Sequence, residues 1–405
     1  MQVHKEEMPS ENNEGSAGIY IHIPFCRQAC HYCDFHFSTS LKKKTELVDC
    51  LVKELELRKT ELKHQTVATI YFGGGTPSLL SNEELQRIMD AVYGNYEVAP
   101  HPEITLEANP DDLMPLTTGG RNSMGSGKGD ASVYLNYKNI GINRLSIGIQ
   151  SFFERDLKLM NRAHSANEAK QCLSEATKHF NNISIDLIYG IPGLSDKDWK
   201  ENIETALKFN VPHISCYALT VEPKTALEAL IKKGQIKHVS DSAAQRQFHI
   251  LIERLEAEGF IHYELSNFGK PEFFSKNNSA YWLGKPYLGI GPSAHSFNGK
   301  TRSWNVKNNP KYIKSIQKGL LPLETEILSV TDRYNEYIMT GLRTIWGVSL
   351  EKIEMEFGRN LKNYLLKQSE IYLTEDLLYI ENNKLLTTNK GKFLIDGISA
   401  SLFKI

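Results

Sequence analysis

Three cysteines lie close together near the start of the chain, in the stretch "YIHIPFCRQACHYCDF". Cys26, Cys30 and Cys33 have the spacing Cys-x3-Cys-x2-Cys. A structural zinc ion needs four tetrahedral ligands, so a nearby histidine would have to join the thiols: His22, His31 or His36. An iron–sulfur cluster can instead be held by three thiolates, which leaves one iron with an open position for another ligand. Both interpretations make this loop a metal site.

The other three cysteines are isolated along the chain. Cys50, Cys172 and Cys216 lie in apolar stretches, where we expect small buried side chains. Six cysteines in 405 residues are not a disulfide scaffold, and we expect a cytoplasmic protein. Residues 1–17 are polar and acidic, lack the apolar segment of a signal peptide and are predicted to be disordered.

The composition is that of a globular protein, with 40% hydrophobic and 23% charged residues. A formal net charge of -1 provides no general attraction to nucleic acid or to an anionic membrane surface. No apolar run reaches the roughly 18 residues of a membrane-spanning helix. We therefore expect neither nucleic acid nor membrane insertion.

The cysteine loop follows an apolar strand, and this order recurs along the first half of the chain. In "IYIHIPF" the apolar side chains Ile19, Ile21 and Ile23 alternate onto one face. Five further strands end in unusual loops: "VATIYF" before GGGTPS, "EITLE" before ANPDD, "INRLSIGI" before QSF, "ISIDLIYG" before IPG and "HISCYALTV" before EPKT. Amphipathic helices are predicted between most of them, at residues 43–63, 81–93, 153–179 and 196–209.

Alternating strands and helices favour parallel pairing through right-handed crossovers. Six such units from Ile19 to about Val221 predict an α/β fold, either a partial (β/α)6 TIM-like barrel or a large open sheet, within a core of residues 18–225. In both arrangements the chemistry gathers at the carboxyl ends of the strands. We expect the cysteine loop and the glycine-rich loop to meet there.

The rest of the chain divides into a linking segment and a small domain. Residues 226–325 are expected to complete the barrel, and residues 326–405 predict three short helices, a hairpin and a last helix, an α+β winged-helix-like domain. Its helices are acidic or mixed, which favours a packing or lid role over DNA binding. A Gly- and Ser-rich insertion near residues 117–132 contains "GSGKGD", but Asn122 and Gly129 replace the residues that a phosphate-binding P-loop requires.

Several of these stretches together resemble the radical SAM superfamily. The Cys-x3-Cys-x2-Cys loop after a first strand is similar to that family's signature, and "YIHIPFC", "GGGTP", "LEANP", "RLSIGIQSF", "NRAHS" and "DLIYGIPG" resemble its oxygen-independent coproporphyrinogen III oxidase-like branch over nearly the whole chain. The resemblance implies a 4Fe–4S cluster on the three cysteines. It also implies S-adenosylmethionine (SAM) bound to the fourth iron through its amino and carboxylate groups.

The resemblance further implies a set of SAM contacts that lie together on or after successive strands: Tyr20, Gly74, Gly75, Thr76, Glu107, Gln150, Arg162 and Asp186. The residue types suit that ligand. Carboxylates such as Glu107 and Asp186 accept hydrogen bonds from ribose hydroxyls or an ammonium group, and Arg162 can pair a carboxylate in a planar fork. No catalytic residue is implied.

Two kinds of protein share this branch. One is the dehydrogenase that oxidatively decarboxylates two propionates of a porphyrinogen, and its cluster motif continues to a further cysteine, as CxxxCxxCxC. The other is the heme chaperone of the HemW type, whose motif continues as CxxxCxxCxF. Phe35 occupies that position here. The resemblance therefore favours a heme chaperone that passes heme to an acceptor protein, with the dehydrogenase as the alternative. An electron donor is a further partner if SAM is cleaved.

Heme chaperones of this type also show a motif HNxxYW. This chain reads "NNSAYW", so Asn277 replaces the histidine, and a carboxamide is a poor axial ligand for heme iron. Tyr281 and Trp282 remain as aromatic side chains that could stack on a porphyrin or pack in the core. His295, in "GPSAHSF", is a second candidate for an axial ligand, or else a buried hydrogen-bonded histidine.

Overall fold

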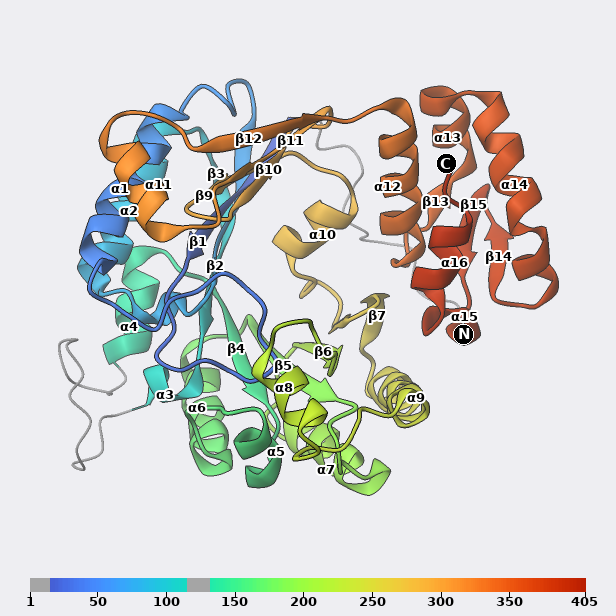
Figure 1. Ribbon diagram of the computed structural model, residues 1–405, viewed down its shortest axis with the longest axis horizontal. Helices are drawn as coiled ribbons and strands as arrows, with labels where there is room; N and C mark the ends of the chain where they lie inside the picture. Colours follow the sequence, from blue (N-terminus) through green and yellow to red (C-terminus); the bar gives the residue numbers. More distant parts are fainter. Residues whose placement is uncertain (1–14, 115–131) are drawn as a thin grey trace.

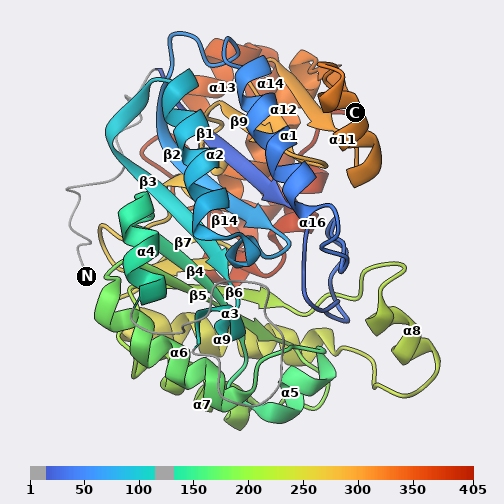
Figure 2. The ribbon, with the colours of Figure 1, turned by 90° about the vertical axis from the view of Figure 1, so that its left-hand side faces the viewer.

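A large curved sheet carries most of the chain in the computed structural model, which describes residues 15–114 and 132–405. In the order β12-β11-β10-β9-β1-β2-β3-β4-β5-β6-β8-β7, twelve strands pair edge to edge, and β1 to β6 are all parallel. The helices between them cover the outer face (Figures 1 and 2). The expected partial (β/α)6 barrel is confirmed.

The strands are short and mostly buried. The six parallel strands are β1 Ser16–Ile23, β2 Thr66–Gly74, β3 Val98–Ala108, β4 Arg144–Gln150, β5 Ile183–Tyr189 and β6 His213–Ala218. The remaining strands of the large sheet are β7 Ile261–Glu264, β8 Asn267–Gly269, β9 Tyr287–Ile290, β10 His295–Phe297, β11 Thr301–Asn305 and β12 Leu323–Ile327. β1 begins at Ser16, two residues before the expected start of the core.

The helices of the barrel are α1 Lys44–Leu57, α2 Asn82–Asn95, α3 Pro110–Leu113, α4 Ser132–Ile140, α5 Glu154–Leu159, α6 Ala166–His179, α7 Asp196–Leu207, α8 Ala226–Lys232 and α9 Asp241–Ala257, with a short 3-10 turn η1 at Pro77–Leu79. Five of these helices, α2, α6, α7, α8 and α9, begin after a Ser or Thr whose side chain caps a free N–H group. Ser81 and Glu84 form a capping box at α2. The helices predicted at residues 81–93 and 196–209 are confirmed as α2 and α7.

Two predicted helices were wrong in extent. The helix expected over residues 153–179 is two helices, α5 and α6, because Asn161 adopts a positive φ of 56° and Ser165 caps a new helix with Glu168. The helix expected over residues 43–63 ends at Leu57 and continues as turns. The insertion near residues 117–132 and the first 14 residues lie outside the described part, apart from the start of α4.

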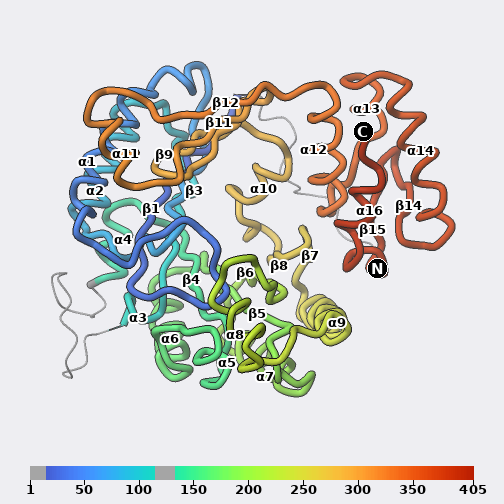
Figure 3. Tube along the Cα trace, in the orientation of Figure 1, coloured from blue at the N-terminus to red at the C-terminus, as the bar shows by residue number. Residues whose placement is uncertain are grey.

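The segment after β8 crosses the inner side of the curved sheet. The chain leaves β8 beside β6, forms α10 Lys276–Trp282 and continues into β9, which pairs in parallel with β1 at the other end of the barrel (Figure 3). Glu103 of β3 accepts hydrogen bonds from the backbone N–H groups of Lys276 at 3.1 Å and Asn277 at 3.0 Å. This buried carboxylate fixes the start of α10 inside the barrel.

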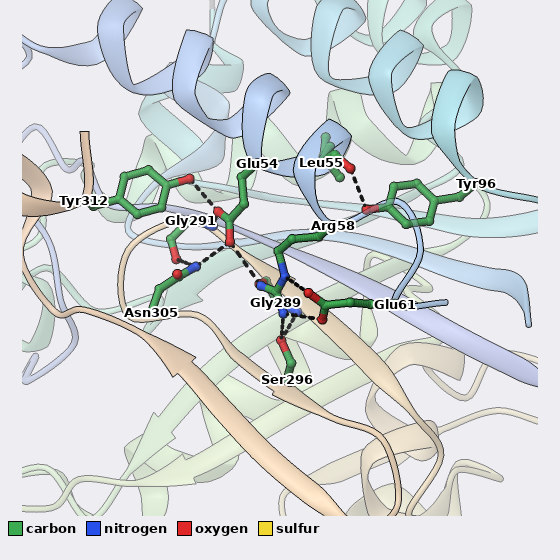
Figure 4. Close-up of polar contacts among 10 residues, drawn as sticks. All are labelled: Glu54, Leu55, Arg58, Glu61, Tyr96, Gly289, Gly291, Ser296, Asn305 and Tyr312. Carbon is green, nitrogen blue, oxygen red and sulfur yellow. Dashed lines mark hydrogen bonds and ion pairs between the residues drawn. The ribbon is translucent and has the colours of Figure 1, made fainter. Parts of the chain in front are cut away.

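The strands β9 to β11 are tied to the barrel by a buried carboxylate on α1. Glu54 accepts hydrogen bonds from the Tyr312 hydroxyl of α11 Asn309–Gln317 at 2.5 Å, from Asn305 Nδ2 at 2.7 Å and from the Gly291 N–H at 2.8 Å (Figure 4). These partners come from three separate segments. One ionised side chain therefore sets how the added strands sit on α1.

Arg58, the residue directly after α1, balances that charge. Its guanidinium donates to Glu54 at 3.0 Å, to the carbonyl of Gly289 at 2.8 Å and to Ser296 at 3.1 Å, and it forms an ion pair with Glu61 at 2.7 Å (Figure 4). The side chains of Arg58 and Glu54 are 0% exposed. An ion pair so deeply buried needs these additional hydrogen bonds to offset its desolvation.

The end of the chain forms a small domain with its own core. Its elements are α12 Val330–Leu342, β13 Val348–Ser349, α13 Leu350–Phe357, α14 Arg359–Thr374, β14 Leu378–Glu381, β15 Lys384–Thr387, α15 Asn389–Lys392 and α16 Ile395–Ser401. The hairpin turns at Asn382 and Asn383, both with positive φ, which is typical of tight hairpin turns. Its apolar core runs from Tyr334 to Leu402, so the expected winged-helix-like domain is confirmed.

Among the helices of the described residues, none is long and apolar enough to cross a membrane.

Replacing Arg58 tests how much the buried ion pair contributes to the stability of the fold. We expect Arg58→Met to lower the free energy of unfolding by about 3–5 kcal/mol, because Glu54 would remain as an uncompensated buried charge. The matched control is Arg87→Met, which breaks an ion pair whose side chains are 47% and 57% exposed, and which we expect to cost less than about 1 kcal/mol. Urea unfolding followed by circular dichroism measures both. Equal losses in the two variants would contradict the role of Arg58.

Candidate functional site

The three clustered cysteines lie in the loop that follows β1. The loop is held back on itself by hydrogen bonds from the Cys26 N–H to the Ser38 carbonyl at 3.1 Å and from the Ser38 N–H to the Pro24 carbonyl at 2.9 Å. All three thiols are partly exposed, whereas Cys50, Cys172 and Cys216 are buried as expected. The loop thus presents three accessible thiols at the carboxyl end of the first strand.

Cys26 and Cys33 lie in surroundings that disfavour a free thiolate. Burial raises the pKa of Cys26 to about 11 and also raises that of Cys33. Arg162 opposes this, and its guanidinium lies 3.4 Å from the Cys30 sulfur. A metal centre bound here would have to displace the protons, which couples its binding to pH.

The three nearby histidines have other partners. His22 contacts the Tyr20 hydroxyl at 3.2 Å and the His36 carbonyl at 3.0 Å, His31 contacts the Leu159 carbonyl at 2.8 Å, and His36 contacts Asn309 at 2.7 Å. Within the described residues, no three His, Cys, Asp or Glu side chains converge on one metal ion. A cluster sets a different requirement, because each thiolate of a 4Fe–4S cluster binds its own iron.

A glycine-rich loop follows β2 and runs directly beneath the cysteine loop. Gly74 has φ of 110°, and a Cβ on it would lie 2.5 Å from the His22 ring; a Cβ on Gly75 would lie 2.5 Å from the Phe25 carbonyl. Only glycine fits both positions. Thr76 is buried and hydrogen-bonds both Asn109 and Cys26. The loop therefore places bare backbone next to the cysteines.

Glu107, at the end of β3, faces the glycine-rich loop. Its carboxylate accepts hydrogen bonds from the Tyr71 hydroxyl at 2.8 Å and from the Gly74 N–H at 3.2 Å. Burial raises its pKa, and the two donors partly oppose that shift. Tyr71 was missed in the sequence, although it lies on β2 two residues before the glycines and stacks on Tyr20 with ring centroids 6.0 Å apart.

Arg162 joins β4 to the cysteine loop. Its guanidinium donates to Asn109 Oδ1 at 2.6 Å and to the Gly148 carbonyl at 2.9 Å, while its buried Nε has no partner in the described part of the chain. A buried donor without a partner is costly and is typical of a ligand site. Asn109, which bridges Arg162 and Thr76, was also missed. Its place in the "LEANP" stretch was the available signal.

Gln150 and Asp186 complete the row of side chains at the ends of the strands. Gln150 is 8% exposed and has a φ of 66°, a strained value for a residue other than glycine. Asp186, on β5, has a pKa raised to about 7 by burial and by Glu107, against the opposing charges of Arg162 and Arg144. The structure thus brings the eight sequence-predicted residues and the three cysteines to one end of the barrel.

The residues predicted to contact heme do not form one cluster. Tyr281 lines a cavity inside the barrel, and Asn277 beside it is 4% exposed and accepts a hydrogen bond from Thr69 at 3.0 Å. Trp282 instead packs under Arg343, 5.3 Å from its ring centroid. His295 is exposed on β10 and stacks on Trp304, so the prediction of a buried hydrogen-bonded histidine was wrong.

Phe35 lies at the edge of the cysteine loop with its side chain 69% exposed. A hydrophobic side chain so open to solvent contributes little to packing, and it brings no group that can ligate a metal. The position that would extend the cysteine pattern therefore carries an apolar surface.

The barrel, the three-cysteine loop and the glycine-rich loop together define a radical SAM protein. The family model of the radical SAM superfamily matches residues 20–206, and that of the HemN C-terminal domain matches residues 316–394. The heme chaperone HemW of Mycobacterium tuberculosis is 33% identical over 95% of this chain and 94% of its own length. The heme chaperone HemW of Bacillus subtilis is 32% identical over 93% of this chain and 96% of its own length. The chain belongs to the HemW family.

A solved structure agrees with the fold. Coproporphyrinogen III oxidase (HemN) from Escherichia coli, a radical SAM enzyme, superimposes with a TM-score of 0.81 over 98% of this chain and 92% of that chain. The sequence identity is 22%, so this likeness concerns the arrangement of the chain alone.

Asp186 gives the site a testable pH dependence. Its pKa of about 7 exceeds the usual unfolded value of about 3.9, so the folded state binds more protons between these values and loses stability as the pH rises through them. Asn cannot ionise. We therefore expect metal-free wild-type protein to lose stability relative to Asp186→Asn between pH 5 and pH 8, roughly the upper part of that window. Urea unfolding at a series of pH values measures the difference.

The matched control is Asp198→Asn. Arg155 lowers the pKa of Asp198, so its contribution is constant through this range and is lost only in acid. A wild-type curve parallel to that of Asp186→Asn would contradict the raised pKa.

Proposed function

We propose that this protein holds a 4Fe–4S cluster on Cys26, Cys30 and Cys33 and binds SAM beside it. Such a cluster offers SAM an open iron, which the amino and carboxylate groups of SAM can occupy. The three partly exposed thiols on one loop support this proposal. So does the closeness of the Arg162 guanidinium to Cys30, since a cation offsets the negative charge of thiolates.

The side chains around the loop suit the parts of SAM. Gly74 and Gly75 bring bare backbone close to His22 and Phe25, where a Cβ would collide, and this backbone is proposed to meet the amino group of SAM. The unpartnered Nε of Arg162 can pair a carboxylate. Glu107, Asp186 and Gln150 are placed to accept hydrogen bonds from hydroxyl or ammonium groups, while Tyr20 and Thr76 pack beneath them. These roles are assigned here on residue type and position.

We further propose that the protein is a heme chaperone rather than a porphyrinogen-oxidising enzyme. One observation carries this choice: Phe35 stands where the dehydrogenase pattern has a further cysteine, and its exposed ring offers neither a thiolate nor a redox group. The relatives that match over nearly their whole length are named heme chaperones. The alternative is the oxygen-independent coproporphyrinogen III dehydrogenase.

Heme itself and an acceptor protein are the partners that this function requires, with an electron donor if SAM is cleaved. Among the predicted heme contacts, His295 is the available axial ligand, since the residue is exposed on β10. Partial desolvation by the neighbouring side chains, together with the charge of Arg302, lowers its pKa, which favours the neutral, ligating form. Tyr281 and Trp282 of α10 are proposed as aromatic contacts. The free state of all six cysteines supports a reducing, cytoplasmic compartment.

The test is a heme titration of anaerobically purified, cluster-reconstituted protein. We expect a Soret band that saturates at one heme per chain and that His295→Ala shifts or weakens. The alternative function, the dehydrogenase, is tested in parallel. The protein is incubated with coproporphyrinogen III, SAM and a reductant, and the mass of the product is measured by mass spectrometry. Loss of propionates without a stoichiometric heme complex would overturn the chaperone in favour of the enzyme.

The cluster assignment has its own test in Cys30→Ser. We expect this variant to lose most of the brown absorbance and of the bound iron and sulfide, because a serine hydroxyl rarely replaces a thiolate on iron. Cys172→Ser is the matched control, since that thiol is on the buried face of α6 and outside the cysteine loop, and its loss should leave the iron content unchanged. Undiminished iron in Cys30→Ser, or zinc without sulfide in the wild type, would refute the assignment.

A further inference from the structure

A polar cavity of about 240 Å³ lies inside the barrel, between the strands and α10. At one end it reaches Glu107 and Asp186, which belong to the proposed SAM site. At the other end it reaches Arg144 and His213, the first residues of the parallel strands β4 and β6, at the end of the barrel opposite the cysteines. Asn267, which begins the antiparallel strand β8, lies between these ends, opposite Ser215 of β6. Barrel interiors are usually filled with apolar side chains, so a polar chamber needs an explanation.

Arg144 is the charged group at that far end. It is 1% exposed and lines the cavity, and its one hydrogen bond is donated to the neutral Asn182 side chain. No carboxylate among residues 15–114 and 132–405 forms an ion pair with it, unlike Arg58, the other fully buried arginine, which pairs with two. A guanidinium kept from both water and a counter-ion is unfavourable, and an anion in the cavity would remove that cost.

The groups around Arg144 are neutral and can form hydrogen bonds. His213 shares hydrogen bonds with the Ser184 hydroxyl at 2.7 Å and with the Tyr263 hydroxyl at 2.8 Å. Burial and the charge of Arg144 lower the pKa of His213, so its imidazole carries no competing positive charge. Ser184 and Ser215 lie 3.3 Å apart between Oγ atoms and also line the cavity. A planar anion beside Arg144 would find the Ser184 hydroxyl next to it. It could also take over the hydrogen bond of the Ser215 hydroxyl, which in this structure donates to Asn267 Oδ1 at 2.5 Å.

Asp186 is the nearest competitor for Arg144, and it is a weak one. It interacts with Arg144 through space, without an ion pair, and its pKa of about 7 leaves it protonated for much of the time at neutral pH. In the proposed function it also faces SAM. Arg162 donates its hydrogen bonds at the cysteine loop, and among the residues that the structure describes Arg144 is the arginine that lines the chamber.

We infer that Arg144, with Ser184 and Ser215, forms a binding site for a carboxylate group inside the barrel. A guanidinium fork flanked by hydroxyls matches the planar shape and two acceptor oxygens of a carboxylate. The cavity volume admits a propionate-sized group and excludes a porphyrin ring. Two sources supply such a group: a free small carboxylate, or a propionate arm of a tetrapyrrole whose ring stays outside.

The position of α10 connects the propionate arm of a tetrapyrrole with the proposed function. This source of the carboxylate rests on the proposed binding of heme. Tyr281 and Asn277 of α10 form the wall across from the strands, so a tetrapyrrole contacting this helix has its carboxylates within reach of the chamber. The first source is independent of heme. The two are separated by asking whether the bound carboxylate has to be attached to a ring.

The experiment compares heme with its dimethyl ester, both titrated into the cluster-reconstituted full chain and followed by the Soret band. If a propionate arm enters the chamber, we expect wild-type protein to bind heme roughly ten- to a hundredfold more tightly than the ester, as for a charge-assisted hydrogen bond to a buried group. Arg144→Gln should abolish that preference, and Arg144→Lys should keep part of it. Arg87→Gln, on the surface of α2, is the control and should leave it unchanged.

A second arm uses isothermal titration calorimetry with sodium propionate in SAM-loaded, heme-free protein, with chloride as the reference anion. The site is assigned to a free carboxylate if two results are found together. Wild-type protein binds propionate and Arg144→Gln does not, and wild-type protein binds heme and its ester with equal affinity. No binding of propionate and no preference for heme over the ester in wild-type protein would overturn the inference, and this result needs no variant to fold. Failure of heme to bind at all would contradict the proposed function, while the calorimetry still decides the carboxylate site.

Discussion

Parallel pairing of the first six strands is the constraint on which the site depends. The register sets His22 beside Gly73 and Ile23 beside Gly74, so the cysteine loop and the glycine-rich loop leave the sheet at the same level. Each later strand repeats this arrangement at its carboxyl end. Side chains separated by up to 160 residues, from Cys26 to Asp186, therefore converge at this end of the sheet, and hydrogen bonds such as that from Arg162 to Cys30 link their segments.

The interior of the barrel is polar because the sheet does not close on itself. The strands β7 to β12 extend it at both ends, and α10 crosses the concave side where further strands would stand in a complete barrel (Figure 1). Two buried carboxylates hold these additions in place, Glu103 at the start of α10 and Glu54 beneath β9 to β11. The frame is thus held by buried carboxylates that each accept several hydrogen bonds, whereas Arg144 at the chamber donates to a neutral amide.

Much of the fold and of the site could be predicted because the signals are local. The six strands show in their apolar alternation, and the cysteines, Gly74 and Glu107 follow their strands directly. What could not be predicted depends on contacts between distant segments. The turn at Asn161 divides a continuous helical pattern. The Asn161 side chain donates to the Ala29 carbonyl of the cysteine loop at 2.7 Å, a contact between distant segments that the sequence pattern does not show. Likewise, Arg144 reads in the sequence as an ordinary polar residue at the start of a strand.

The contrast between Arg58 and Arg144 shows why burial alone does not assign a role. Both side chains are removed from water, but Arg58 has two carboxylates and a carbonyl within hydrogen-bond distance and serves to join α1 to the added strands. Arg144 has a neutral amide and an open chamber. A buried guanidinium has a structural role where the protein itself supplies the anion. It can bind a ligand where the protein leaves the anion to be supplied by that ligand. By that criterion the functional region of this barrel extends from the cysteine loop through the interior to the opposite ends of its strands.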